Sequence, residues 1–256
     1  MTPSANERPP VTVEVVVDSV DGARAAATAG ADRLELCSAP ALGGLTPSLG
    51  LLRHVLAAVQ LPVVAMLRPR AGDFLYAPDE FAVLRADLEE LAAAGAHGFA
   101  AGVLTADGDV DRAHMRELVQ AAGPLPVTCH RAFDVARDPA SALAQLADLG
   151  VARVLTSGQR RTAALGADCI RDLVGRAQGR IAVMAGAGVR AANVAALVAA
   201  TGVREVHLSA SRFEPAGMRH HNPDVAMATV AADDERQVRR TDGDEIAAVR
   251  AALRGG

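Results

Sequence analysis

The chain has 256 residues, half of them hydrophobic, and a formal net charge of −4. This length is typical of one large α/β barrel, and the negative charge argues against a nucleic-acid partner, which would require a basic patch. No apolar run approaches the roughly 18 residues of a membrane span. Residues 1–10 are polar and proline-rich and lack an apolar signal core, so we expect a disordered tail on a cytoplasmic protein.

All 26 basic residues are arginine. The lack of lysine excludes Schiff-base chemistry and a phosphate-binding P-loop, because both need a lysine amine. The three cysteines stand at wide, irregular spacing, which gives neither a disulfide framework nor a zinc-ligand pattern.

Short apolar runs alternate with alanine-rich amphipathic segments along the chain. The predicted strands are Val11–Asp18, Asp32–Cys37, Pro62–Arg68, His97–Leu104, a run entering Thr128–Asp134, Arg153–Ser157, Arg180–Ala185 and Glu205–Ala210. The predicted helices begin at Ser19, Ser48, Asp79, Asp111, Asp138, Ala167 and Asn193.

Eight strand–helix units predict a single (β/α)₈ TIM barrel over residues 11–256. A doubly wound open sheet has a similar pattern, but no GxGxxG motif follows the first strand, which disfavours the dinucleotide-binding version. We expect a C-terminal extension from about residue 211 that is irregular and ends in a helix at Asp244–Leu253.

Ionisable side chains recur near the ends of these apolar runs, although a strand covered on both faces should be almost entirely apolar. Because residues two apart share a face of a strand, these side chains are expected to point into the barrel, towards its C-terminal mouth. The residues concerned are Glu14, Glu35, Arg68, His130 and His207. The structural alternative is a set of buried ion pairs, in which Glu14 and Glu35 meet Arg68 and Arg131.

Backbone N–H groups after the later strands of a barrel often bind phosphate. Gly186-Ala187-Gly188 follows the seventh strand, and Ser209 lies near the end of the eighth. Ser157, at the end of the sixth strand, is expected to extend the same anion site.

Several motifs together resemble the CutC family of copper homeostasis proteins. They are Glu14–Ser19, Arg33–Cys37, Gly43–Ser48, Arg68–Phe74, His130–Asp134, Leu155–Gln159 and Gly186–Val189. The resemblance implies a TIM barrel, a cytoplasmic location, a homo-oligomer that is often a dimer, and a role in copper homeostasis.

Two functions from different classes follow. As a copper-binding protein, the chain would use Cys37 as the anchor, because thiolates select Cu(I), with His130 or His207 as co-ligand. Some relatives carry a second cysteine where Val16 stands here, and Cys129 is expected to face away from His130.

As an enzyme, the chain would act on a small anionic metabolite, such as a sugar phosphate or carboxylate, without a nucleotide cofactor. Arg68, Arg70 and Arg131 would clamp the anion. Glu35 and His130 would exchange protons, and Asp134 would orient the imidazole. Glu14 completes the candidate catalytic residues.

Overall fold

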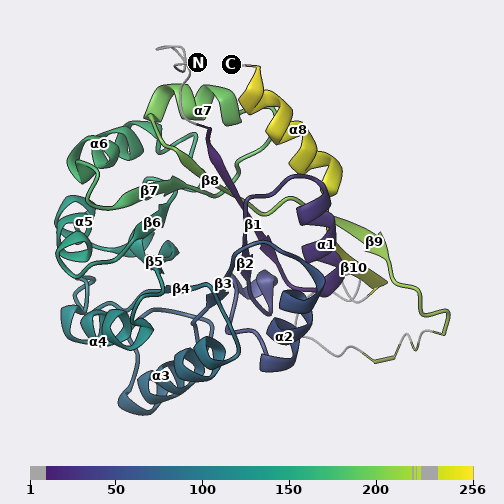
Figure 1. The fold of residues 1–256 in the computed structure, drawn as a ribbon, viewed down its shortest axis with the longest axis horizontal. Coiled ribbons are helices and arrows are strands. Elements are labelled where there is room, and N and C mark those ends of the chain that lie inside the picture. Colours follow the sequence, from purple (N-terminus) through teal and green to yellow (C-terminus); the bar gives the residue numbers. More distant parts are fainter. Residues whose placement is uncertain (1–9, 221, 223, 226–235, 256) are drawn as a thin grey trace.

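The computed structural model describes residues 10–220, 222, 224–225 and 236–255. Eight parallel strands close into a barrel in which the first strand pairs with both the second and the eighth (Figure 1). The predicted (β/α)₈ barrel is therefore confirmed, and the open sheet is not observed.

The strands are short and the helices surround them. The barrel strands are β1 (Thr12–Val17), β2 (Arg33–Leu36), β3 (Val63–Met66), β4 (Gly98–Ala101), β5 (Val127–Cys129), β6 (Arg153–Thr156), β7 (Ala182–Ala185) and β8 (Glu205–Leu208). The helices are α1 (Val20–Thr28), α2 (Leu49–Ala58), α3 (Pro78–Ala93), α4 (Arg112–Ala122), α5 (Pro139–Asp148), α6 (Ala167–Ala177), α7 (Val194–Thr201) and α8 (Gly243–Arg254). Two 3₁₀ turns, η1 (Pro40–Leu42) and η2 (Arg131–Val135), lie in the loops after β2 and β5.

Four helices begin where the sequence predicts, because a side chain caps each of them. The hydroxyls of Ser19 and Ser48 accept hydrogen bonds from the first turns of α1 and α2. The carboxylates of Asp111 and Asp138 do the same for α4 and α5. Each cap stabilises its helix by about 1 kcal/mol.

Alternation along the strands separates two apolar regions. Val13, Val15 and Val17 of β1 are fully buried in the large core between strands and helices, so Glu14 points into the barrel. A much smaller apolar cluster, which includes Cys37 and Met66, fills part of the barrel interior. Polar side chains occupy much of the remaining interior, and this is where the site lies.

The segment after β8 is more regular than the sequence predicts. β9 (Ser211–Pro215) pairs antiparallel with β10 (Gln237–Thr241) to form a two-stranded ribbon. The expectation of an irregular segment was wrong because most of these side chains are exposed or half-buried, so they carry no alternating hydrophobic signal. Helix α8 follows and confirms the predicted terminal helix. Within the described ranges, no helix combines the length and the apolar character needed to cross a membrane.

Candidate functional site

A cavity of about 930 Å³ opens at the C-terminal ends of the barrel strands, beneath the β9–β10 ribbon. This volume suits a small ligand, and in barrel enzymes this end holds the active site. Its ionisable lining residues come from five barrel strands, or the loops that follow them, and from the ribbon: Asp18, Glu35, Cys37, Arg68, His130, Arg131, Asp134, His207 and Arg239. Most residues that the sequence marks as candidates therefore surround one cavity.

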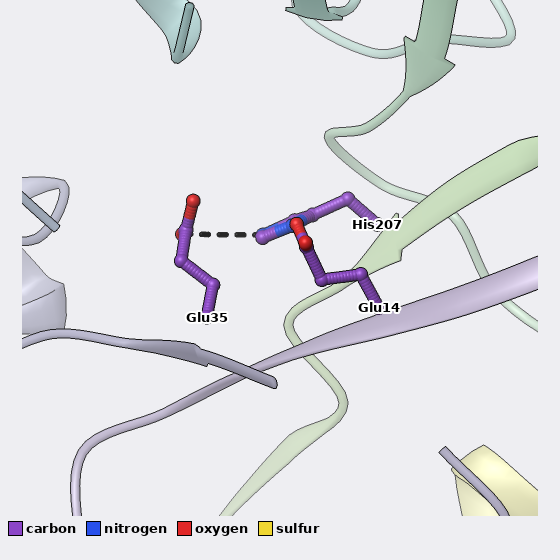
Figure 2. A group of neighbouring side chains, drawn as sticks. All are labelled: Glu14, Glu35 and His207. Carbon is purple, nitrogen blue, oxygen red and sulfur yellow. Dashed lines mark hydrogen bonds and ion pairs between the residues drawn. The ribbon is translucent and has the colours of Figure 1, made fainter. Parts of the chain in front are cut away.

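Each ring nitrogen of His207 lies near a carboxylate, Nδ1 near Glu14 and Nε2 near Glu35 (Figure 2). Nδ1 of His207 is 2.8 Å from Oε1 of Glu14, and its Nε2 is 3.8 Å from Oε2 of Glu35. All three side chains are buried. Glu35 and His207 line the cavity, whereas Glu14 does not. Glu14 contacts His207 through Nδ1 of the imidazole.

The charges of this trio are set by burial and by neighbouring charges. Burial alone would raise the pKa of Glu14, but His207 and Arg33 outweigh it and lower that pKa to about 2. Burial raises the pKa of Glu35 to about 7, and the charge of Glu14 adds to this effect. Burial would lower the pKa of His207, yet the Glu35 and Glu14 carboxylates raise it. The protonation states of His207 and Glu35 are therefore coupled.

Arg33 was not among the predicted site residues. Its guanidinium contacts Glu14 through Nε at 2.5 Å and Glu205 through Nη2 at 2.5 Å. Arg153 also contacts Glu205, at 3.1 Å. The suggested pairing of Glu14 and Glu35 with Arg68 and Arg131 was therefore wrong. The sequence carried a signal, because Arg33 is two residues from Glu35 and so shares its inward face.

His130 differs from the predicted proton carrier. Its Nδ1 accepts a hydrogen bond from the backbone N–H of Ala132, and its buried Nε2 has no hydrogen-bond partner among the described residues. Burial, together with the charge of Arg68, lowers the pKa of His130 to about 3. The ring is thus neutral, with its hydrogen on Nε2. A side chain at Gly102 would lie within 3 Å of this ring, so the glycine makes room for it.

Asp134 does not orient His130 as predicted. Its carboxylate accepts hydrogen bonds from the Thr156 hydroxyl, the backbone N–H of Ser157 and the guanidinium of Arg131. The Ser157 hydroxyl also donates to this carboxylate or to Arg160 O. Ser157 is therefore committed to this network and not free to hold an anion. Arg131 lines the cavity and remains half exposed.

The predicted arginine clamp is only partly present. Arg68 lines the cavity, but its Nη atoms donate to carbonyls of the two loops after β2 and β3, and its guanidinium lies over Phe74. Its buried Nε has no hydrogen-bond partner in the part of the chain that the structure describes. Arg70 is not in the cavity, because it pairs with Glu80 and Asp73 and lies over Tyr76.

The glycine segment after β7 does not present the backbone N–H groups that were expected to bind a phosphate. The N–H of Gly186 donates to Thr156 O and so belongs to the barrel ladder. The carbonyl of Gly188 accepts from Asn193, and neither glycine lines the cavity. Ala187 and Ser209 do line it.

The β9–β10 ribbon contributes Arg239, a second residue that sequence reasoning missed. Its Nη1 lies 3.4 Å from the Asp18 carboxylate, and its Nη2 donates to the carbonyl of Ser209. Phe213 and Gln237 of the ribbon also line the cavity. The ribbon therefore places a partly buried cation over the floor of the cavity.

The donor set around Cys37 does not fit copper. Burial raises the pKa of the Cys37 thiol to about 12, and the charges of Glu35 and Asp18 add to this effect, whereas Cu(I) selects thiolates. Cys129 packs in the outer core, facing away from His130 as predicted. In the described part of the chain, one group of three potential ligand atoms is close together, and it belongs to Glu14, Glu35 and His207. It contains no sulfur, and its Glu14 is already bound by Arg33.

The fold and cavity define a (β/α)₈ barrel protein with a ligand pocket at its C-terminal mouth. Comparison with known proteins then assigns the family. The CutC family model matches residues 11–212, and the chain belongs to the CutC family. It is 46% identical over 241 residues to the CutC protein of Salmonella paratyphi B, covering 94% of this chain and 96% of that one. It is 45% identical over 242 residues to the CutC protein of Mesorhizobium japonicum, covering 94% of both chains.

Solved structures agree with this assignment. The structure of CutC from Streptococcus agalactiae, provisionally described as a copper homeostasis protein, is 29% identical with a TM-score of 0.74. It covers 77% of this chain and 97% of its own. A thiamine phosphate pyrophosphorylase from Pyrococcus furiosus is only 12% identical, with a TM-score of 0.58 and 96% of each chain covered. This second likeness supports the barrel fold alone.

Proposed function

We propose that the chain is an acid–base enzyme that moves a proton within a small anionic metabolite bound at the barrel mouth. The observation that carries this proposal is the line Glu14–His207–Glu35, which ends in the cavity. Glu14 holds Nδ1 of His207, so Nε2 faces Glu35. A proton taken up by Glu35 can therefore pass to His207 and return.

The pKa of Glu35 suits this role. An acid–base group works best when its pKa is close to the operating pH, and burial raises the pKa of Glu35 to about 7. A perturbed carboxyl group in a cleft is also a general indicator of a functional site. Arg131 and Arg239, from η2 and β10, supply positive charge for the anionic part of the ligand.

The alternative is a role in copper homeostasis, the role named in the description of the Streptococcus relative; in this chain, copper would bind through Cys37. The high pKa of this thiol and the nitrogen and oxygen donors nearby argue against it. A cytoplasmic location forms part of our proposal and is supported by three cysteines that are all free thiols. A homodimer, which the resemblance implies, is also proposed.

The test uses a metabolite extract incubated in D₂O with the purified protein and then analysed by mass spectrometry. We expect at least one anionic metabolite to gain deuterium or to change in abundance with the wild-type protein but not with Glu35→Gln. Glu90→Gln, which alters an exposed carboxylate of α3, is the matched control and should behave like the wild type. Identical profiles for the wild-type protein and Glu35→Gln would overturn the proposal.

A further inference from the structure

Four buried polar atoms of cavity-lining residues have no hydrogen-bond partner within the described chain. One of them, Nη1 of Arg239, still lies 3.4 Å from the Asp18 carboxylate. The other three are Oε1 of Glu35, Nε of Arg68 and Nε2 of His130. Buried polar groups in proteins are nearly always paired, so each exception needs an explanation. A ligand that supplies the missing partners explains all three together, because their residues line one cavity.

Two of these atoms are donors on neighbouring side chains. Arg68 keeps a hydrogen on Nε at every accessible pH. His130 carries its hydrogen on Nε2, because the N–H of Ala132 donates to Nδ1. The Arg68 guanidinium carbon and the His130 ring centroid each lie 5.1 Å from the centroid of the Phe74 ring. Both donor side chains therefore pack on the Phe74 ring, and all three residues line the cavity.

The third atom has the opposite character. Oε1 of Glu35 is an acceptor when the carboxyl group is ionised, and its other oxygen faces His207. Two donors and one proton acceptor are what a carbonyl compound requires when a proton leaves the carbon beside its carbonyl group. The negative charge then develops on the carbonyl oxygen, where N–H donors stabilise it.

Resting on the proposed function, we infer that the substrate is a small ketone or aldehyde that carries a carboxylate or phosphate group. Its carbonyl oxygen accepts hydrogen bonds from His130 Nε2–H and Arg68 Nε–H. The C–H bond of the adjacent carbon breaks, and its proton goes to the Glu35 carboxylate. The electron pair forms a carbon–carbon double bond, and the carbonyl π pair moves onto the oxygen. Return of the proton to the same carbon restores the carbonyl group and completes the exchange without a co-reactant.

Proton exchange in D₂O tests this inference, with pyruvate and dihydroxyacetone phosphate as probes. We expect deuterium to enter at least one probe with the wild-type protein. His130→Phe should slow this exchange on the order of 10²–10³-fold, the usual effect of losing one donor to a developing oxyanion. His130→Gln, which retains an N–H donor, should recover part of the rate.

A second measurement uses the unmodified protein and so does not depend on how the variants fold. Oxalate, a planar mimic of an enolate, is added while the ¹⁵N and ¹H NMR signals of the histidines are followed. We expect the Nε2–H proton of His130 to move downfield while Nδ1 stays unprotonated. Exchange that needs Glu35 but is unchanged in His130→Phe would overturn this inference and leave the proposed function standing. This inference would also be overturned if neither probe exchanged and the His130 signal did not move. The extract experiment would then test the proposed function separately.

Discussion

Nδ1 of His207 lies 2.8 Å from Oε1 of Glu14, across the seam where β8 meets β1 and closes the barrel. The two residues are 193 positions apart in sequence, yet they are direct partners in the parallel pairing of the strands. Closure of the barrel therefore creates the contact that orients His207. Any change that opens this seam should disturb folding and the site together.

Loss of the Glu14 carboxylate should destabilise the fold. In Glu14→Gln, Glu205 remains as the ion-pair partner of Arg33 among the described residues, and His207 keeps only the more distant Glu35, at 3.8 Å. Breaking a buried pair by removing one partner typically costs about 3–5 kcal/mol. Urea unfolding at pH 7 measures this loss, and Glu90→Gln should change the free energy of unfolding by less than about 0.5 kcal/mol. A loss below about 1 kcal/mol for Glu14→Gln would mean that Glu205 alone compensates Arg33.

The stability of the protein should depend on pH through Glu35. Because burial raises the pKa of Glu35 from 4.5 to about 7, the folded protein retains a proton that the unfolded chain releases. The stabilising contribution is complete below pH 4.5 and is lost as the pH rises to about 7. Its upper bound is about 3 kcal/mol. Chemical denaturation at a series of pH values should show a decline between pH 5 and 6.5 in the wild type and a flatter profile in Glu35→Gln. Equal slopes would show that Glu35 titrates normally.

Copper binding, if it depends on Cys37, should be weak. A thiol with a pKa of about 12 is a poor source of thiolate at neutral pH. Competition titration with Cu(I) should therefore detect one weak site per chain that disappears in Cys37→Ala and persists in Cys169→Ala. Tight binding that survives Cys37→Ala would show that other residues hold the metal.

Arg239 should select anionic ligands. Its side chain is mostly buried beside Asp18, whereas that of Arg240 is half exposed beside Glu214. Calorimetric titration with oxalate should give a dissociation constant about 10- to 100-fold higher in Arg239→Met, as expected for a lost hydrogen bond to a charged group. Arg240→Met is the control on the same strand and should leave the constant unchanged. Equal affinities in both variants would remove Arg239 from the binding site.

The protein should be a dimer in solution, as its resemblance to CutC proteins implies. One chain has a mass of 26.3 kDa, so light scattering at micromolar concentration should give about twice that value. A monomer mass would contradict the expectation.

The barrel and much of the site could be predicted because they depend on local rules. Period-two alternation assigned Glu14, Glu35 and His207 to the inner face without knowledge of the register. Pairing partners could not be predicted in the same way. Arg68 and Arg131 were suggested as the ion-pair partners of Glu14 and Glu35. The register of β1 and β2 instead places Arg33 directly beside Glu14.

The remaining errors involve loops and exposed strands. Arg70 has the same two-residue spacing as the inward-facing residues of β3, but it lies in the loop after the strand. There it forms an ion pair with Glu80. Ser157 reaches the right end of the barrel but is engaged by Asp134. The ribbon that carries Arg239 buries too little apolar surface to leave a pattern in the sequence. In each case the deciding contact is tertiary, and no local spacing encodes it.

The family match ends at residue 212, whereas β10 and Arg239 come later in the chain. The floor of the cavity lies within the region that the family model matches, whereas β10 lies beyond it, although the alignments to the Salmonella and Mesorhizobium proteins cover 94% of this chain. Closure of the barrel requires β8 to pair with β1 and makes no demand on the ribbon. A change in the ribbon could therefore alter which ligands enter the cavity without disturbing the strand pairing that brings Glu14 to His207.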